Sequence, residues 1–156
     1  MENRASSNTR IIKATPEQLY HAFTDPLILE RFLAPGDMIA QIHSFNLRVG
    51  GGYSMSLFYP ATDQKSQGKS GAKEDRFTSK FIELQPFHKI TTATQFDTEE
   101  EAFKGEMTMT VLFTPVDEKH TKISISFNNI PDGIRIEDNE KGTELTLNKL
   151  TSLFED

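Results

Sequence analysis

Histidine is the side chain best suited to acid–base or metal chemistry near neutral pH. The chain contains four histidines, His21, His43, His88 and His120. No two of them have the spacing of an HxH or HExxH motif, so the sequence gives no indication of a metal site. His43 alternates with Phe45 and Leu47 in an expected strand. It can face the interior as an acid or base, or it can be a hydrogen-bonded or outward-facing sheet residue.

Nucleophilic catalysis also lacks a recognisable set of residues. The chain has no cysteine, which excludes disulfides, thiolate metal sites and a cysteine nucleophile. It has no G-x-S-x-G motif, and no serine is tied to a histidine by spacing. Catalysis by a carboxylate pair stays open, because 23 acidic residues offer many accidental pairs. The sequence favours a non-enzymatic protein, and no cofactor is expected.

Two other polar features have a structural and a functional interpretation. Residues 50–52 are all glycine but precede an expected strand rather than a helix, which favours a hairpin or bulge over a phosphate-binding loop. Glu74 and Arg76 precede Phe77, and Gln95 precedes Phe96. Such side chains can orient a ligand in an apolar cavity, or they can form an exposed cross-strand pair and a strand-end amide.

Composition narrows the class of partner. The 156 residues carry a formal net charge of −6, which argues against binding to a phosphate backbone. No apolar run is long enough to span a membrane, and the polar first ten residues do not resemble a secretion signal. A cytoplasmic location is therefore expected. The chain has 12 phenylalanines, three tyrosines and no tryptophan, which favours a dry interior filled by side chains or by an apolar ligand.

The elements that would position these residues follow from periodicity and turn residues. Thr15, Pro16 and Gln18 are typical of a capped helix start, and residues 24–26 repeat that signal for a second short helix. The expected strands cover residues 9–14, 38–49, 53–59, 77–84, 88–96, 107–114 and 122–127, with an exposed loop at 60–73. A long helix is expected from about residue 137 to residue 154. Helices separated from a run of hairpins indicate an α+β fold and a single domain spanning residues 1–156.

Alternation along the strands predicts which side chains face the core. Tyr53, Met55 and Leu57 lie on the same face of the strand expected at 53–59. Met107 and Met109 lie on the same face of the strand expected at 107–114. In the last helix, Thr143, Leu147, Leu150 and Phe154 form one stripe. Leu145 lies off this stripe and has no evident role.

Five segments together resemble a known family. They read ATPEQLYHAFTDP at 14–26, RVGGGY at 48–53, FIELQPFHKI at 81–90, IPD at 130–132 and NKLTSLF at 148–154. Their order is similar to that in the START-like (SRPBCC) superfamily, and within it to homologues of the activator of the heat-shock protein 90 ATPase. The resemblance implies a helix-grip fold, in which a curved antiparallel sheet wraps round a long C-terminal helix, with two short helices after the first strand.

The chain also departs from the family pattern. The family commonly has tryptophans after the second helix, where this chain has Arg31, Phe32 and Leu33. It commonly opens the last helix with Gly-Trp, where this chain has Gly142 and Thr143. Because aromatic walls set the shape of a pocket, no ligand preference is carried over from the family.

The main functional hypothesis is a non-enzymatic domain whose apolar cavity binds a small hydrophobic or amphipathic ligand. The expected cavity residues are His43, Phe45, Met55, Leu57, Phe77, Phe96, Met107, Met109 and Leu147. The first alternative, implied by the resemblance, is regulation of an Hsp90-type chaperone ATPase. The second is an enzyme like the cyclases and hydratases of the wider superfamily. The sequence leaves the ligand, the oligomeric state and the biological process open.

Overall fold

The computed structural model describes residues 4–34, 36–60 and 74–154. Most of the loop expected at 60–73 lies outside these residues. The described strands are β1 Ser6–Ile12, β2 Ile39–Asn46, β3 Gly52–Phe58, β4 Glu74–Gln85, β5 Lys89–Phe96, β6 Met107–Pro115 and β7 Thr121–Asn128. The described helices are α1 Pro16–Thr24, α2 Pro26–Phe32, the short 3₁₀ helix η1 Glu101–Phe103 and α3 Ile136–Leu153.

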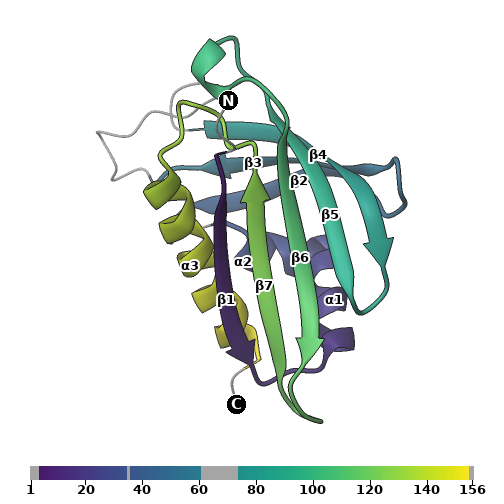
Figure 1. The fold of residues 1–156 in the computed structure, drawn as a ribbon. Coiled ribbons are helices and arrows are strands. Elements are labelled where there is room, and N and C mark those ends of the chain that lie inside the picture. Colours follow the sequence, from purple (N-terminus) through teal and green to yellow (C-terminus); the bar gives the residue numbers. More distant parts are fainter. Residues whose placement is uncertain (1–3, 35, 61–73, 155–156) are drawn as a thin grey trace.

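The strands form one antiparallel sheet in the order β1-β7-β6-β5-β4-β3-β2. Consecutive strands from β2 to β7 are neighbours, and β1 pairs with β7 from Ser6↔Phe127 to Ile12↔Thr121. Figure 1 shows β1 and β7 running lengthwise beside α3, while β2, β3 and β4 run in a different direction. The sheet is therefore strongly curved, and the expected α+β helix-grip architecture is confirmed.

The two short helices begin where the sequence predicts. The Thr15 side chain accepts a hydrogen bond from the Gln18 backbone N–H, and the Gln18 side chain accepts one from the Thr15 backbone N–H. At the start of α2, the Asp25 carboxylate accepts a hydrogen bond from the Leu27 backbone N–H at 2.9 Å. These caps pair N–H groups that have no partner within the helix. They set the first residues of α1 and α2. These helices cover part of the sheet; Phe23 of α1, for example, contacts Phe113 of β6.

The glycine run serves a turn and a close strand approach. Gly50 has a φ of 88°, a conformation that favours glycine. A Cβ atom on Gly52 would lie 2.0 Å from the Ser79 backbone oxygen, so no larger residue fits beside β4. Strand β3 begins at Gly52. The hairpin interpretation of residues 50–52 is thus confirmed.

One strand departs from the alternation that the sequence suggests. A register shift in the pairing of β2 with β3 lies between Ile42 and Ser44, so that Ile42 pairs with Met55 and Ser44 with Ser54. The bulge places one extra residue, His43, in β2. As a result His43 is exposed and Phe45 is partly buried against the core, so the two do not share an inward face.

Helix α3 packs its predicted stripe into the core. Leu147 and Leu150 have no exposed surface, and Thr143 and Thr146 are buried beside them. The Thr146 hydroxyl donates to the Leu33 backbone oxygen at 3.1 Å, and the Lys149 ammonium donates to the Ala34 backbone oxygen at 2.6 Å. These bonds fasten α3 to the end of α2. In the part of the chain that the structure describes, no helix is both long and apolar enough to cross a membrane.

Leu145, which the periodicity left without a role, lies next to a tight turn. Its Cδ1 atom would be 3.5 Å from a Cβ atom added to Gly36. Gly36 has a φ of 60° and follows α2 in the connection to β2. Leu145 therefore packs beside the α2–β2 connection, outside the stripe that faces the sheet.

Candidate functional site

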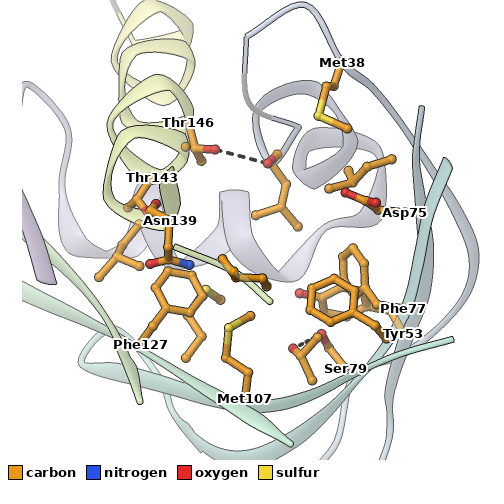
Figure 2. A pocket seen from close by; sticks show the side chains of 18 of the residues that line it. Met38, Tyr53, Asp75, Phe77, Ser79, Met107, Phe127, Asn139, Thr143 and Thr146 are labelled. Atoms are coloured by element: carbon orange, nitrogen blue, oxygen red, sulfur yellow. Dashed lines mark hydrogen bonds between the residues drawn. The ribbon is translucent and has the colours of Figure 1, made fainter. Parts of the chain in front are cut away.

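A partly enclosed cavity of about 240 Å³ lies between the inner face of the sheet and α3. Figure 2 shows residues of α3 on one side of it and residues of the sheet on the others. Its wall is formed by Phe23, Leu33, Met38, Tyr53, Leu57, Tyr59, Asp75, Phe77, Ser79, Thr94, Phe96, Met107, Met109, Ile125, Phe127, Ile134, Asn139, Gly142, Thr143 and Thr146.

Strand alternation explains most of the apolar wall. In β6, Met107 and Met109 are buried on the inner face, and Thr108 and Thr110 lie on the other. In β4, Phe77 points inward and contacts Phe96 of β5 edge to face, with ring centres 6.0 Å apart. The sheet thus contributes a surface of phenylalanine and methionine, side chains that need no hydrogen-bond partner.

Five of the nine residues expected at the cavity lie on its wall: Leu57, Phe77, Phe96, Met107 and Met109. Two others, Met55 and Leu147, point inward but have no exposed surface, because neighbouring core residues cover them completely. Phe45 is stacked on Tyr53 at 5.7 Å between ring centres and lies outside the cavity wall.

His43, which was expected as a polar residue of the cavity, does not lie on the cavity wall. Its Nε2 atom lies 2.8 Å from Ser56 Oγ, and the Ser56 hydroxyl donates to the Glu74 carboxylate. Ser56 therefore accepts its bond from the histidine N–H. This network lies on the opposite face of the sheet from Met55 and Phe77, because Ser56 and Glu74 are each an odd number of residues from them along the same strands. His43 has the hydrogen-bonded sheet role that the sequence offered as the alternative.

A row of hydroxyl groups crosses the cavity wall on three adjacent strands. Ser79 of β4 and Thr94 of β5 have their side-chain oxygens 2.6 Å apart, as the lower dashed line of Figure 2 shows. The Tyr53 phenol of β3 interacts with Ser79 as well. Burial raises the pKa of Tyr53 to about 12, although the hydrogen bond with Ser79 acts in the opposite direction. The phenol therefore stays uncharged at neutral pH.

A buried carboxylate forms a second polar position. Asp75 is only 3% exposed, although it lies near the beginning of β4. The Tyr59 hydroxyl donates to Asp75 Oδ2 at 2.9 Å. Both residues belong to the cavity wall, so this end of the cavity carries an acceptor of hydrogen bonds.

Helix α3 provides the polar groups on the opposite side. Figure 2 shows Asn139, Thr143 and Thr146 along the helix, across the cavity from Asp75 and Phe77. The Ser6 hydroxyl of β1 donates to Asn139 Oδ1. This bond holds the amide oxygen toward β1, which leaves the amide nitrogen of Asn139 on the cavity side, as Figure 2 shows.

The sequence contained signals for two of the polar residues that it did not single out. Asp75 is two residues before Phe77 and therefore shares its face, whereas Glu74 and Arg76 alternate outward. Asn139 is four residues before Thr143, on the same stripe of the helix. Gln95 is exposed, as its strand-end interpretation predicts. The described residues contain no group of three or more histidine, aspartate or glutamate side chains that could hold a metal ion.

Comparison with a family model gives a match over nearly the whole chain. Residues 13–155 match the family described as activator of Hsp90 ATPase homolog 1-like protein. No curated protein matches the chain.

Solved structures with the same fold come from several organisms. A protein of Chromobacterium violaceum is 28% identical with a TM-score of 0.86, and the alignment covers 98% of each chain. A protein of Mycobacterium smegmatis is 15% identical with a TM-score of 0.74, covering 97% of this chain and 90% of its own. An HSP90 activator of Plasmodium falciparum is 29% identical with a TM-score of 0.57, covering 96% of this chain and 89% of its own.

Proposed function

The chain belongs to the family of activator of Hsp90 ATPase homolog 1-like proteins, and we propose that it acts as a binding domain whose cavity holds a small apolar or amphipathic molecule. The observation that carries the proposal is the cavity of about 240 Å³ between α3 and the sheet. Its phenylalanine and methionine wall offers contacts to an apolar ligand, and its few polar groups can orient one end of it.

The volume of the cavity sets the size of the ligand. An apolar protein cavity of about 150 Å³ is large enough for benzene, so by proportion this cavity accommodates about ten non-hydrogen atoms. The expected ligand is therefore a short-chain or single-ring compound. Burial of its apolar surface favours binding by about 25 cal/mol per Å² before the cost of association is subtracted.

Titration calorimetry with 1-octanol tests this proposal. We expect the wild-type protein to bind one equivalent with a negative heat-capacity change, because apolar surface leaves water. Thr143→Trp places a large side chain in the cavity wall and should abolish the binding. The matched control, Ser152→Trp, adds the same side chain at an exposed position of α3 and should leave binding intact. Absence of binding to the wild type would contradict the proposal, as would equal binding to Thr143→Trp.

Regulation of an Hsp90-type ATPase is the second candidate function. It is supported by the family description and by the 29% identity to the HSP90 activator of Plasmodium falciparum. Adding the chain to a purified Hsp90 should then raise its rate of ATP hydrolysis. Stimulation that persists in Thr143→Trp would assign this activity to the protein surface rather than to the cavity. An unchanged rate of hydrolysis would argue against this candidate.

A further inference from the structure

Three neighbouring strands place hydroxyl groups side by side on the cavity wall. Tyr53 of β3 pairs with Ser79 of β4, and Ser79 pairs with Thr94 of β5. All three residues line the cavity, and they are only 5%, 1% and 7% exposed. Figure 2 shows Tyr53 and Ser79 on the sheet side of the cavity, across from Asn139 and Thr143 of α3. Tyr53, Ser79 and Thr94 together form the hydroxyl row of the cavity.

The hydroxyl row has more protons to donate than it uses internally. Each of the three hydroxyl groups carries one proton. Two hydrogen bonds connect the row, one between Ser79 and Thr94 at 2.6 Å and one between Tyr53 and Ser79. Among the described residues, these three hydroxyl groups have no further hydrogen-bond partner. At least one proton of the row is therefore available to a molecule in the cavity.

This surplus donor determines which polar group of a ligand fits the row. A buried donor that is left without an acceptor loses its hydration and gains nothing in return. A ligand that displaces water from the row must therefore supply an acceptor atom. A carbonyl oxygen does so, whereas a hydrocarbon does not.

The surroundings of the hydroxyl row favour an acceptor without charge. The described part of the cavity wall contains no lysine, arginine or histidine that could neutralise an anionic ligand. Burying an anion without a cationic partner is strongly unfavourable. Beside the row, the Phe77 and Phe96 rings offer an apolar surface on the same face of β4 and β5. The expected polar group is therefore a neutral oxygen attached to an apolar body.

We propose that the hydroxyl row is the subsite for an uncharged oxygen acceptor, and that the cavity binds small apolar carbonyl compounds. This inference rests on the ligand-binding role proposed above and adds the class of ligand to it. The carbonyl oxygen accepts a hydrogen bond from the row, and the apolar body lies against the phenylalanine and methionine wall. The oxygen of an alcohol can accept the same bond.

Acetophenone and isopropenylbenzene test the inference, because the C=O group of the first is replaced in the second by a C=CH₂ group of similar shape. Dissociation constants of both probes are measured by calorimetry for the wild type and for the row variant Tyr53→Phe/Ser79→Ala/Thr94→Val. All three hydroxyl groups are removed together, because loss of one end of the row would still leave a proton to donate. Joint replacement by apolar side chains also leaves no unpaired hydroxyl group of the row in the interior.

A control variant removes hydroxyl groups on the other face of the sheet. Ser7→Ala/Ser126→Ala eliminates an exposed pair between β1 and β7, in which the two oxygens lie 3.3 Å apart. The measured quantity is the dissociation constant of acetophenone divided by that of isopropenylbenzene, which cancels a general change in the fit of the cavity. We expect this ratio to rise about tenfold in the row variant, the effect of one lost hydrogen bond, and to stay unchanged in the control. Equal ratios in the wild type and the row variant would overturn the inference.

The infrared C=O stretch of bound acetophenone provides a second readout that needs no variant. A hydrogen bond weakens the C=O bond, so the stretching frequency in excess wild-type protein should lie below its value in hexane. A frequency equal to that in hexane would overturn the inference even if the row variant did not fold. Failure of the wild type to bind either probe would instead overturn the ligand-binding proposal itself.

Discussion

At the scale of single residues, the described part of the cavity wall combines uncharged hydroxyl groups with the carboxylate of Asp75. The Tyr53 phenol illustrates the effect of burial on such a group. Because little water reaches it, the charged phenolate is disfavoured, and burial raises the pKa of Tyr53 to about 12 against an ordinary value of 10.0. The wall therefore stays uncharged at Tyr53 over the whole neutral and mildly alkaline range.

The shifted pKa of Tyr53 predicts how stability depends on pH. The unfolded chain ionises this phenol near pH 10, whereas the folded protein does so only near pH 12. The contribution of Tyr53 to stability is complete below pH 10 and is lost as the pH rises toward about 12. The wild type should lose roughly 2–3 kcal/mol relative to Tyr53→Phe over this interval. Denaturant unfolding of both proteins at several alkaline pH values measures the difference, and a constant difference would contradict a buried, neutral phenol.

Some residues of the cavity wall could be predicted from the sequence, and others could not. Phe77, Met107 and Met109 could be placed on an inner face because alternation is a local property of a strand. Asp75 shares the parity of Phe77, but a buried acid conflicts with the ordinary preference of charged side chains for water, so composition gave no reason to select it. Its carboxylate accepts a hydrogen bond from the Tyr59 hydroxyl, a contact that forms only in the folded chain.

At the scale of elements, the order and type of the helices and strands could be predicted from the sequence, but a local irregularity such as the β2 bulge could not. Capping residues and turn residues act over a few positions, which is why α1 and α2 begin at their predicted residues. The bulge at His43 has no such local signal. It arises from the pairing of β2 with β3, and one inserted residue reverses the direction of every later side chain in the strand.

Helix α3 is the element whose packing most directly supports the cavity. Leu150 has no exposed surface, so Leu150→Ala should lower the free energy of unfolding by about 2–5 kcal/mol through lost burial and an unfilled space. The same substitution at Leu27, which is 75% exposed, should cost less than about 0.5 kcal/mol. Urea unfolding of both variants provides the comparison. A cost at Leu150 as small as that at Leu27 would contradict the placement of α3 on the sheet.

At the scale of the whole molecule, curvature creates the cavity. The sheet is continuous from β1 to β2, and α3 packs near both ends through its contacts with β1 and with the end of α2. We propose that the chain folds as one domain, because its first and last strands are neighbours in one sheet. The volume of the cavity was beyond prediction from the sequence. The volume depends on which inward side chains contact one another. Met55 and Leu147, for example, were expected to line the cavity but are completely covered by core residues.

The central claim is that a small molecule binds between α3 and the sheet, and methionine methyl NMR tests it most directly. Met38, Met107 and Met109 line the cavity, whereas Met55 is fully buried in the core and serves as an internal control. On titration with 1-octanol, the methyl signals of the three wall methionines should shift together and saturate, with little change at Met55. Saturable shifts confined to Met55, or an absence of shifts at all four methyl groups, would contradict the account.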